Sequence, residues 1–375
     1  MKHVNCQICG NSCVKYGKTK AGSQRWFCNN CKTTFTVEID NSAKQLQIFL
    51  KWLFSKQTQH EMPGEGRTFR RKSAQFWNIW PLPPVVSERK NVLYLDGIYI
   101  SRKACILICC DEQYVLGWYL CRYENAGAWN SLLSRIAAPK VEVSDGGTGF
   151  AKALKKMWPH TEHQRCVYHV FSQVKRYTTG RPKTPAGTEL FMLSKDLLQV
   201  DNREKSEQWI ERFINWMKKY MAFLSQITRD ENGNERPTHE RLLKAQRAIL
   251  RLISEGTMFT YLDEDLLNEI EKIPSTNNRI EGGINSRLRA MLRDHRGLSI
   301  ERRIKAVFWW CYMHSPKPLS ASEILKIMPI DKSISEIYKK MNHRDKLENS
   351  IPTWGDAVAW GDLHSQNSTY RSDWC

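Results

Sequence analysis

Short apolar runs separated by polar breaks occupy residues 91–166. The first run, NVLYLDGIYI at residues 91–100, is rich in Val, Ile and Tyr and is typical of a buried strand. KACILICC and QYVLGWYLC predict two more strands, and KVEVSDGG and TEHQRC predict a fourth and a fifth. NAGAWNSLLSRIA and TGFAKALKKMW are helix candidates on either side of the fourth strand. The predicted order of elements is therefore β-β-β-α-β-α-β.

That order is the order of an RNase H-like core, in which the first and fourth strands are parallel neighbours. Residues 91–176 form the first part of this core. Residues 177–275 carry Leu, Ile, Met and Trp at helical spacing and almost no strand pattern, which predicts an all-α insertion broken by the polar loop TRDENGNERP. Trp209 and Trp216, seven residues apart, are expected in its core. The predicted fold class is α/β, with a mixed five-stranded sheet interrupted by helices.

After the insertion, residues 276–315 return to the core as helices. STNNRIEGGINSRLRAMLRDHRG predicts a helix capped by Ser275, Thr276 or Asn277, and SIERRIKAVFWWCYMH predicts a second helix that is mostly buried. Residues 316–375 are a polar C-terminal extension with several prolines, and no function is assigned to it. Trp354 and Trp360 could dock this extension onto the body.

Residues 41–80 predict a small helical unit. SAKQLQIFLKWLF is an amphipathic helix that begins at Ser42, and RTFRRKSAQFWNIW follows a Pro/Gly turn. In the second segment Phe69, Phe76, Trp77 and Trp80 share a helical spacing, which leaves four cations to face outward: Arg67, Arg70, Arg71 and Lys72. This suits a helix-turn-helix whose last helix reads DNA, and a solvated basic face is the alternative. Residues 81–90, PLPPVVSERK, read as a linker because their prolines forbid a regular ladder.

The charge of the chain points to an anionic partner. The 375 residues contain 57 Lys+Arg and 39 Asp+Glu, a formal net charge of +18. Residues 1–90 hold 15 of the Lys/Arg and only 5 of the Asp/Glu. Nucleic acid and an anionic membrane are the usual partners of such a chain. No apolar run is long enough to span a membrane and no export signal is visible, so we expect an intracellular protein with DNA as its partner.

Four N-terminal cysteines have the spacing of a zinc ribbon in residues 1–40. Cys6-x2-Cys9 and Cys28-x2-Cys31 form two CxxC turns, each able to present two sulfurs on one side. Intracellular cysteines are thiols or metal ligands rather than disulfides. The pattern predicts one structural Zn²⁺, with four unrelated free thiols as the alternative. Cys13 lies outside the spacing and is expected to be a spare thiol.

Two aspartates stand at the centre of the strand pattern. Asp96 interrupts the first run, and Asp96-Gly97 could instead be a hairpin turn. Asp145 ends the fourth predicted strand, and its Ser-Asp-Gly-Gly context is also a good turn. If the first and fourth strands are neighbours about 4.8 Å apart, the two carboxylates face one another and can hold Mg²⁺ through oxygen ligands. The order of elements favours this interpretation over the turns.

A third carboxylate and a Cys/His cluster follow. Glu281 is the one acid in a basic stretch, in which the acid would bind metal and the cations would bind the phosphate backbone, although a solvated helix face is the alternative for Glu281 alone. The cations and the amide expected at the DNA are Arg279, Asn285, Arg287, Arg289 and Arg293. His160, His163, Cys166 and His169 recur every three residues. They cannot share one helix face, so we expect Cys166 and His169 to pair near the site in a structural role, rather than as a second metal site.

The ordered motifs resemble those of a known family. YLDGIYI, VSDGGTGF, HQRCVYH and STNNRIEGGINSRLR, in that order, are similar to the motifs of Mutator-like bacterial insertion-sequence transposases, here with a zinc ribbon at the front. The resemblance covers residues 1–315. It implies an Asp-Asp-Glu catalytic triad at Asp96, Asp145 and Glu281, and it maps the family's Cys-x2-His motif onto Cys166 and His169. The family usually has an asparagine three residues after the glutamate, whereas Asn285 stands at four.

The resulting hypothesis is a DDE transposase. Two Mg²⁺ (or Mn²⁺) ions on the three carboxylates would support cleavage of the transposon's terminal inverted repeats and strand transfer to target DNA. A homodimer on DNA, located in the cytoplasm at the nucleoid and with no membrane contact, is expected. Two alternatives remain open: a catalytically inactive or domesticated zinc-ribbon DNA-binding protein, and an RNase H-like nuclease without strand transfer.

Overall fold

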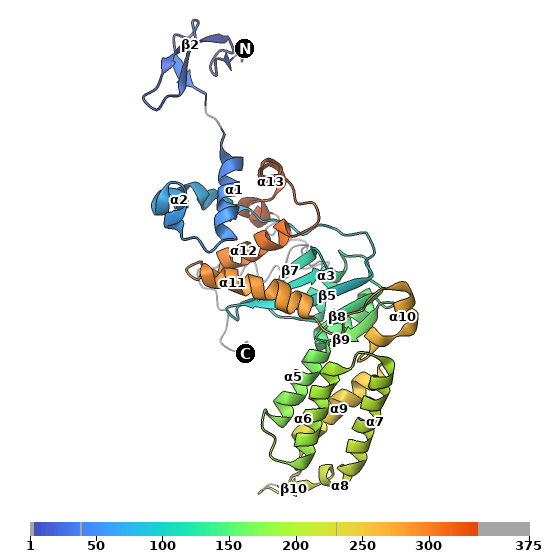
Figure 1. The fold of residues 1–375 in the computed structure, drawn as a ribbon. Coiled ribbons are helices and arrows are strands. Elements are labelled where there is room, and N and C mark those ends of the chain that lie inside the picture. The colour runs from blue at the N-terminus through green and yellow to red at the C-terminus, as the bar shows by residue number, and fades with distance from the viewer. Residues whose placement is uncertain (1–3, 38–39, 230, 337–375) are drawn as a thin grey trace.

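The computed structural model describes residues 4–37, 40–229 and 231–336. The expected docking of Trp354 and Trp360 falls outside the described residues. Within them, no helix is both long and apolar enough to cross a membrane. The described chain divides into a small cysteine-containing sheet, a central mixed sheet covered by helices, and a bundle of helices beyond one edge of that sheet (Figure 1).

The N-terminal sheet is antiparallel throughout. Its four strands follow the order β1-β2-β3-β4 and are β1 (Val4–Asn5), β2 (Ser12–Lys18), β3 (Gln24–Phe27) and β4 (Thr34–Thr36). Its apolar interior is limited to cysteines, with Trp26 and Phe35 packed against them. A core this small does not stabilise a module without a metal or another cross-link.

The central sheet has five strands in the order β7-β6-β5-β8-β9. These are β5 (Val92–Ile100), β6 (Ala104–Cys110), β7 (Val115–Cys121), β8 (Val141–Ser144) and β9 (Glu162–Arg165), with α3 (Ala126–Leu133) and α4 (Thr148–Met157) before and after β8. The predicted order of elements is confirmed. Strand β5 pairs antiparallel with β6 and parallel with β8, and β9 pairs parallel with β8. The hairpin alternative for Asp96-Gly97 is wrong, because both residues pair with β6 inside the ladder.

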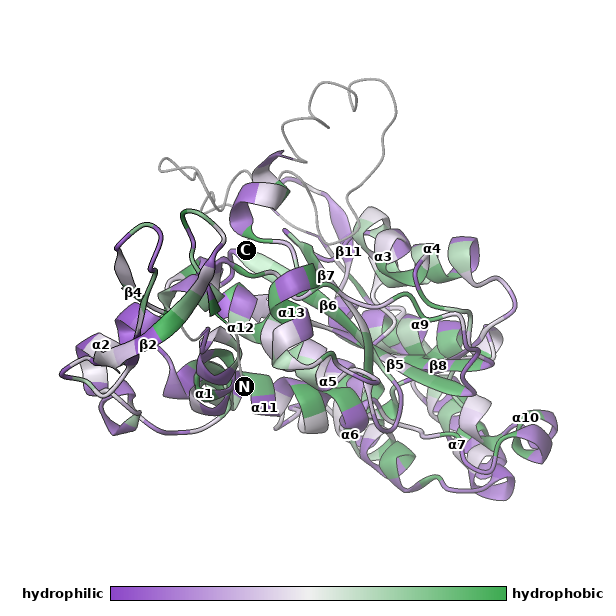
Figure 2. Ribbon diagram, turned by 90° about the horizontal axis from the view of Figure 1, so that it is seen from above, coloured by the Kyte–Doolittle hydropathy of each residue, from purple (hydrophilic) through white to green (hydrophobic). Residues whose placement is uncertain are grey.

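Alternate residues of β5 enter two different cores. Leu93 and Leu95 pack with helices α3 and α4, through Trp129 and Phe150 among others. Tyr94 and the other even-numbered apolar residues face the opposite layer of helices. This division follows from the two-residue period of a strand. Figure 2 shows the apolar strands lying between helices whose outer faces are polar.

The helices beyond β9 form their own core. They are α5 (Val167–Thr178), α6 (Pro185–Asp196), α7 (Arg203–Lys219), α8 (Met221–Leu224), α9 (Glu240–Ser254) and α10 (Glu264–Glu269). Trp209 and Trp216 are buried here and donate their indole N–H groups to backbone carbonyls, as expected for core residues. The predicted polar loop contains a short hairpin of β10 (Ile227–Arg229) and β11 (Glu235–Pro237). Val167 already packs into this core, so the helical packing begins ten residues before the expected boundary at 177.

The helical unit at residues 41–80 shares its core with the central sheet. It contains α1 (Ser42–Leu53), the 3₁₀ turns η1 (Gln59–Glu61) and η2 (Ala74–Asn78), and α2 (Glu65–Ser73). Phe49 and Trp77 of this unit belong to the same buried cluster as Ile106 and Trp118 of the sheet. The expected second helix is shorter than predicted, because its α-helical part ends at Ser73.

Residues 81–90, the expected linker, are bonded to the sheet domain rather than extended freely in solvent. Residues 81–90 contain no helix or strand, in agreement with their prolines. Nevertheless the Val86 amide donates to the Arg135 carbonyl at 3.0 Å and its carbonyl accepts from Ala137 at 2.8 Å. The segment is therefore bonded along the turn that follows α3.

The last described elements close the layer opposite α3 and α4. They are the π-helix η5 (Arg279–Asn285), α11 (Ser286–Asp294), α12 (Ile300–Met313) and α13 (Ala321–Ile327). The start of the polar extension is tied to the body, because Asp331 accepts hydrogen bonds from the Trp80 indole and from the buried Lys305 ammonium, both at 2.6 Å. Residues 41–80 and 316–336 are therefore parts of one folded layer rather than separate units.

Candidate active site

The parallel pairing of β5 with β8 brings two aspartates together. Tyr94 is the partner of Val143, and two residues further along each strand direction stand Asp96 and Asp145. Because side chains alternate with a period of two, both carboxylates start from the same face of the sheet. Asp145 lies one residue beyond β8, where its Oδ1 accepts the Gly147 amide at 3.0 Å. Asp96 Oδ1 accepts the Gly97 amide at 2.9 Å.

Glu281 reaches the same region from the π-helix η5. Two buried asparagines fasten this segment to β5, since Asn277 Nδ2 donates to the Leu95 carbonyl at 3.0 Å and Asn285 Nδ2 donates to Asp96 Oδ2 at 2.6 Å. A π-helix holds more residues per turn than an α-helix. It therefore brings Asn285, four residues after Glu281, to the side of the helix that faces Asp96. The expected helix is present, but its first part is a π-helix that continues into α11.

The three carboxylates repel one another. The pKa of Asp96 is raised to about 7, first by burial and then by the negative charges of Glu281 and Asp145. Burial also raises the pKa of Glu281, and the negative charge of Asp145 raises it too. His169 and Arg289 act in the opposite direction and lower this pKa. A cation bound between carboxylates that lie this close together stabilises their charged forms.

The arrangement is open rather than closed around one point. Among the described residues, two groups bring three or more ligand atoms within 4.8 Å of one another: the four cysteines, and Cys166 with His169 and Glu281. The trio of Asp96, Asp145 and Glu281 is not one of these groups. Glu281 Oε1 is buried and accepts no hydrogen bond among the described residues, although His169 Nδ1 lies 3.3 Å from it.

Cys166 and His169 lie beside Glu281. Cys166 stands immediately before α5, and its Sγ accepts the Asn277 amide at 3.2 Å, although burial raises the pKa of the thiol. His169 Nδ1 is 3.3 Å from Glu281 Oε1. These two side chains connect α5 to the segment that carries Glu281 and form with Glu281 a group of possible metal ligands, so their structural role stays a prediction. His163 is directed elsewhere and pairs with the buried Glu142.

Sequence reasoning missed a fourth acid, Glu124. This residue follows β7, and its Oε1 occupies the space over Gly97, where an added Cβ would be only 2.5 Å away. Burial raises the pKa of Glu124 to about 7, with Asp145 as a further cause. Strands β5, β7 and β8 run in the same direction, so an acid just beyond β7 falls at the same edge of the sheet as Asp145. The position of Glu124 just after the third predicted strand was the sequence signal that could have identified it.

The predicted DNA contacts differ in exposure. The four cations of α2 are exposed: Arg67, Arg70, Arg71 and Lys72. Arg287, Arg289 and Arg293 are also exposed, whereas Arg279 is partly buried and donates from Nε to the Glu112 carbonyl at 2.8 Å. Asn285 is wrong as a DNA contact in this structure, because it is fully buried and its amide is bonded to Asp96.

The four-cysteine group has the form of a zinc site. Each CxxC turn directs a backbone amide at its first sulfur, with Ile8 N–H to Cys6 at 3.5 Å and Cys31 N–H to Cys28 at 3.4 Å. Such bonds favour thiolates, and a hydrogen bond from the Asn11 backbone is the main cause that lowers the pKa of Cys9 to about 6. The donor set and the convergence of the sulfurs fit one Zn²⁺. Cys13 is buried nearby but is not in this group, as expected for a spare thiol.

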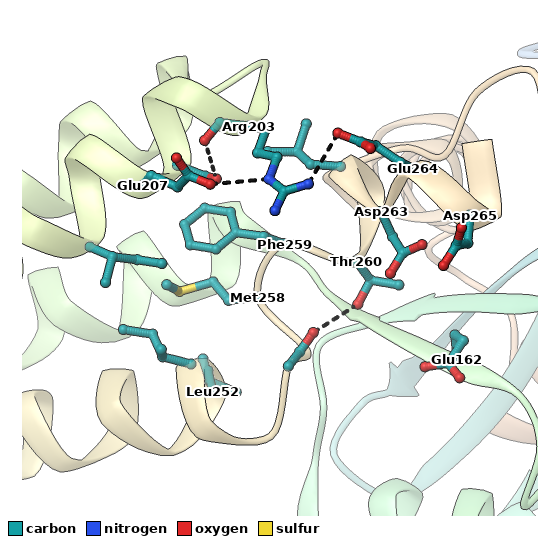
Figure 3. Close-up of a pocket in the computed structure, with 15 residues that line it drawn as sticks. Glu162, Arg203, Glu207, Leu252, Met258, Phe259, Thr260, Asp263, Glu264 and Asp265 are labelled. Carbon is teal, nitrogen blue, oxygen red and sulfur yellow. Dashed lines mark hydrogen bonds and ion pairs between the residues drawn. The ribbon is translucent and has the colours of Figure 1, made fainter. Parts of the chain in front are cut away.

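A hollow of about 420 Å³ lies between the helical bundle and β9 and is not part of the candidate active site (Figure 3). Arg203 points into it, between Glu207 at 3.0 Å and Glu264 at 3.1 Å (Figure 3). Its remaining polar lining is mostly acidic. A cavity with this charge does not suit a phosphate backbone.

Removal of one zinc ligand tests the cysteine site. We expect the wild-type chain and Cys13→Ala to bind one Zn²⁺, and Cys28→Ala to lose it, because a tetrahedral thiolate site needs all four sulfurs. Released zinc is measured with a chromogenic chelator after the protein is unfolded. Equal zinc content in Cys28→Ala and Cys13→Ala would refute the site.

Charge repulsion at Asp96 predicts that its neutral analogue is more stable. The pKa of Asp96 is about 7 in the folded protein against an ordinary value of 3.8. Its ionisation therefore does not destabilise the fold below pH 3.8, and the destabilisation grows as the pH rises and is complete above 7. We expect Asp96→Asn to raise the free energy of unfolding of the metal-free protein by about 2 kcal/mol at pH 8 and to lose this gain near pH 4. Urea titrations at both pH values measure it. The matched control, Asp201→Asn at an exposed ion pair, has no such gain, and a pH-independent effect of Asp96→Asn would contradict the repulsion.

Comparison with known proteins agrees with these elements. Residues 105–235 match the family described as "Transposase, Mutator family". The chain is similar to the transposase for insertion sequence element IS6120 of Mycolicibacterium smegmatis, with 27% identity over 37% of this chain and 46% of that protein. It is also similar to the transposase for insertion sequence element IST2 of Acidithiobacillus ferrooxidans, with 24% identity over 28% of this chain and 37% of that protein.

The chain thus spans less than half the length of the curated relatives it matches. The family match runs from β6 to β9 and on through helices α5 to α8, so it leaves out the central strand β5, and it includes Asp145, Cys166 and His169. Asp96 and Glu281 lie outside the matched residues. Taken together, the family match and the two relatives show that this chain is similar to Mutator-type insertion-sequence transposases.

Proposed function

We propose that this chain is a DDE transposase, which cleaves the ends of its own insertion sequence and joins them to target DNA. The observation that carries the proposal is the alignment of Asp96 with Asp145 through the β5–β8 register, with Glu281 held over them. A sheet built as β7-β6-β5-β8-β9, with its first and fourth strands parallel, supports an RNase H-like core. The burial of Asp96 and Glu281 close to other negative charges supports a cation site.

Asp96, Asp145 and Glu281 would hold two Mg²⁺ or Mn²⁺ ions. Oxygen donors, a raised Asp96 pKa and a buried Glu281 oxygen that accepts no hydrogen bond among the described residues fit hard divalent cations. Two ions would be shared among the three carboxylates, so the three acids need not meet at one point. When bound, such ions activate the attacking oxygen and stabilise the leaving oxygen of the phosphodiester.

The neighbouring side chains position these acids. Asn285 holds one Asp96 oxygen, which fixes the rotation of that carboxylate. His169 faces Glu281 and, with Arg289, offsets part of its charge. The exposed Arg289 guanidinium is then available to a phosphate next to the acids. These residues orient the site and bind the backbone without forming a covalent bond to DNA.

DNA is the proposed partner at the terminal inverted repeats and at the target. The net charge of +18 and the exposed cations of α2 and α11 support a phosphate-binding surface. The zinc ribbon and the helical unit at residues 41–80 would read the repeats, and two copies of the chain would act together on two ends. Binding of Zn²⁺ by the ribbon is part of this proposal.

Cleavage of end DNA tests the catalytic assignment. In Mg²⁺, Asp96→Asn should lower cleavage of a duplex that carries the element's end by at least about 10³-fold, because an essential carboxylate is lost, while DNA affinity stays within about twofold. Gel assays of cleavage and of binding measure the two. Asp201→Asn is the control and should cleave as the wild type does. Retained cleavage by Asp96→Asn would refute the triad.

The same assay separates the alternatives. With pre-cleaved end DNA and a target plasmid, a transposase forms joined products, whereas a nuclease without strand transfer forms none. A protein that binds end DNA but neither cleaves nor joins it would be a non-catalytic DNA-binding protein.

Deletion of the ribbon alone tests the division of labour. Residues 41–80 share the sheet's core, so their removal would disturb the fold, whereas residues 1–40 have a separate core. We expect the chain without residues 1–40 to remain folded, as measured by circular dichroism, and to lose about tenfold or more in affinity for end DNA over random DNA. Unchanged preference for end DNA would remove the ribbon from repeat recognition.

A further inference from the structure

A pocket of about 470 Å³ adjoins Glu281 on the side away from the two aspartates' strands. Its walls come from two segments, the start of α5 and the residues that lead into η5 and α11. They are Cys166, Tyr168, Thr276, Asn278, Glu281, Gly282 and Arg289. No residue of β5 or β8 lines it, and Glu281 is the member of the three carboxylates that borders this hollow.

An exposed aromatic ring stands at this pocket. Tyr168 is 52% exposed although it belongs to the first turn of a helix whose neighbouring residues Val167 and Val170 are buried. Its ring contacts His169 and Phe171 at centroid distances of 6.3 and 6.2 Å, which leaves much of it uncovered. An aromatic face of this kind is a platform on which a nucleobase stacks, whatever its identity.

The polar groups of the pocket suit the edge of a base and the phosphate of a nucleotide. Asn278 is exposed, and its amide oxygen lies across Gly282, where an added Cβ would be 2.4 Å from it. Carboxamides pair with the edges of bases. Arg289 is exposed and close enough to Glu281 to lower the pKa of that carboxyl, which places a cation between the pocket and the catalytic acids. Guanidinium groups bind phosphate.

We propose that this pocket binds the unpaired terminal nucleotide of the transposon end. The base stacks on Tyr168, the Asn278 amide meets the base edge, and Arg289 holds the phosphate beside Glu281. A paired base cannot enter, because a base inside a duplex is stacked on both faces and must leave the helix to fill a concave site. The inference rests on the proposed function for its substrate, since a cleaved end supplies a terminal nucleotide that can unpair.

A base-deletion experiment tests the pocket. Two pre-cleaved end duplexes are compared in Ca²⁺, without cleavage: one with an unpaired terminal nucleotide, and one with a tetrahydrofuran abasic analogue at that position. The wild-type chain should bind the first about tenfold more tightly, as expected from the loss of one base–aromatic contact. Tyr168→Ala should bind both equally, whereas Tyr168→Phe keeps the ring and the preference. Competition fluorescence anisotropy measures each affinity.

Tyr114→Ala is the matched control. Tyr114 is 42% exposed and does not line the pocket, so its loss should leave the tenfold preference unchanged. Equal binding of the two duplexes by the wild type would overturn the inference, and so would a preference that persists in Tyr168→Ala. A separate assay, cleavage of end DNA by the wild type in Mg²⁺, tests the proposed function. A wild type that does not cleave, but shows the Tyr168-dependent preference, refutes the catalytic proposal and supports the nucleotide pocket.

Discussion

The parallel register between β5 and β8 is the constraint on which the candidate site depends. Tyr94 opposite Val143 fixes Asp96 relative to Asp145, and a shift of one residue would turn one of these carboxylates to the other face of the sheet. The two apolar faces of β5 prevent such a shift, because they pack into different cores. Packing far from the acids therefore determines their geometry.

The same register creates an electrostatic cost that other contacts must offset. Buried carboxylates destabilise a fold unless hydrogen bonds or cations compensate them. The buried asparagines 277 and 285 bond to β5 and keep the Glu281 segment over the sheet despite the repulsion. The two asparagines that position the site thus also stabilise the fold at the place where the carboxylates destabilise it.

Local pattern was sufficient for much of this architecture. Short apolar runs and the polar breaks between them located the strands, and the order of elements predicted the parallel neighbours that align Asp96 and Asp145. Pattern could not reveal that Phe49 and Trp77 share a core with the sheet, because that contact joins segments far apart in the chain. It also could not predict the π-helix around Glu281, which depends on tertiary bonds from Asn277 and Asn285 to β5, or the position of Glu124 over Gly97.

The bond from Trp80 to Asp331 has a consequence for the order of folding. The helical unit near the N-terminus is synthesised early, but its core is completed by α12 and by Asp331, more than two hundred residues later. Contacts of such long sequence separation form late, and domains otherwise fold as they leave the ribosome. On the nascent chain, the exposed cations of α2 therefore reach their final positions only after Asp331 has been synthesised.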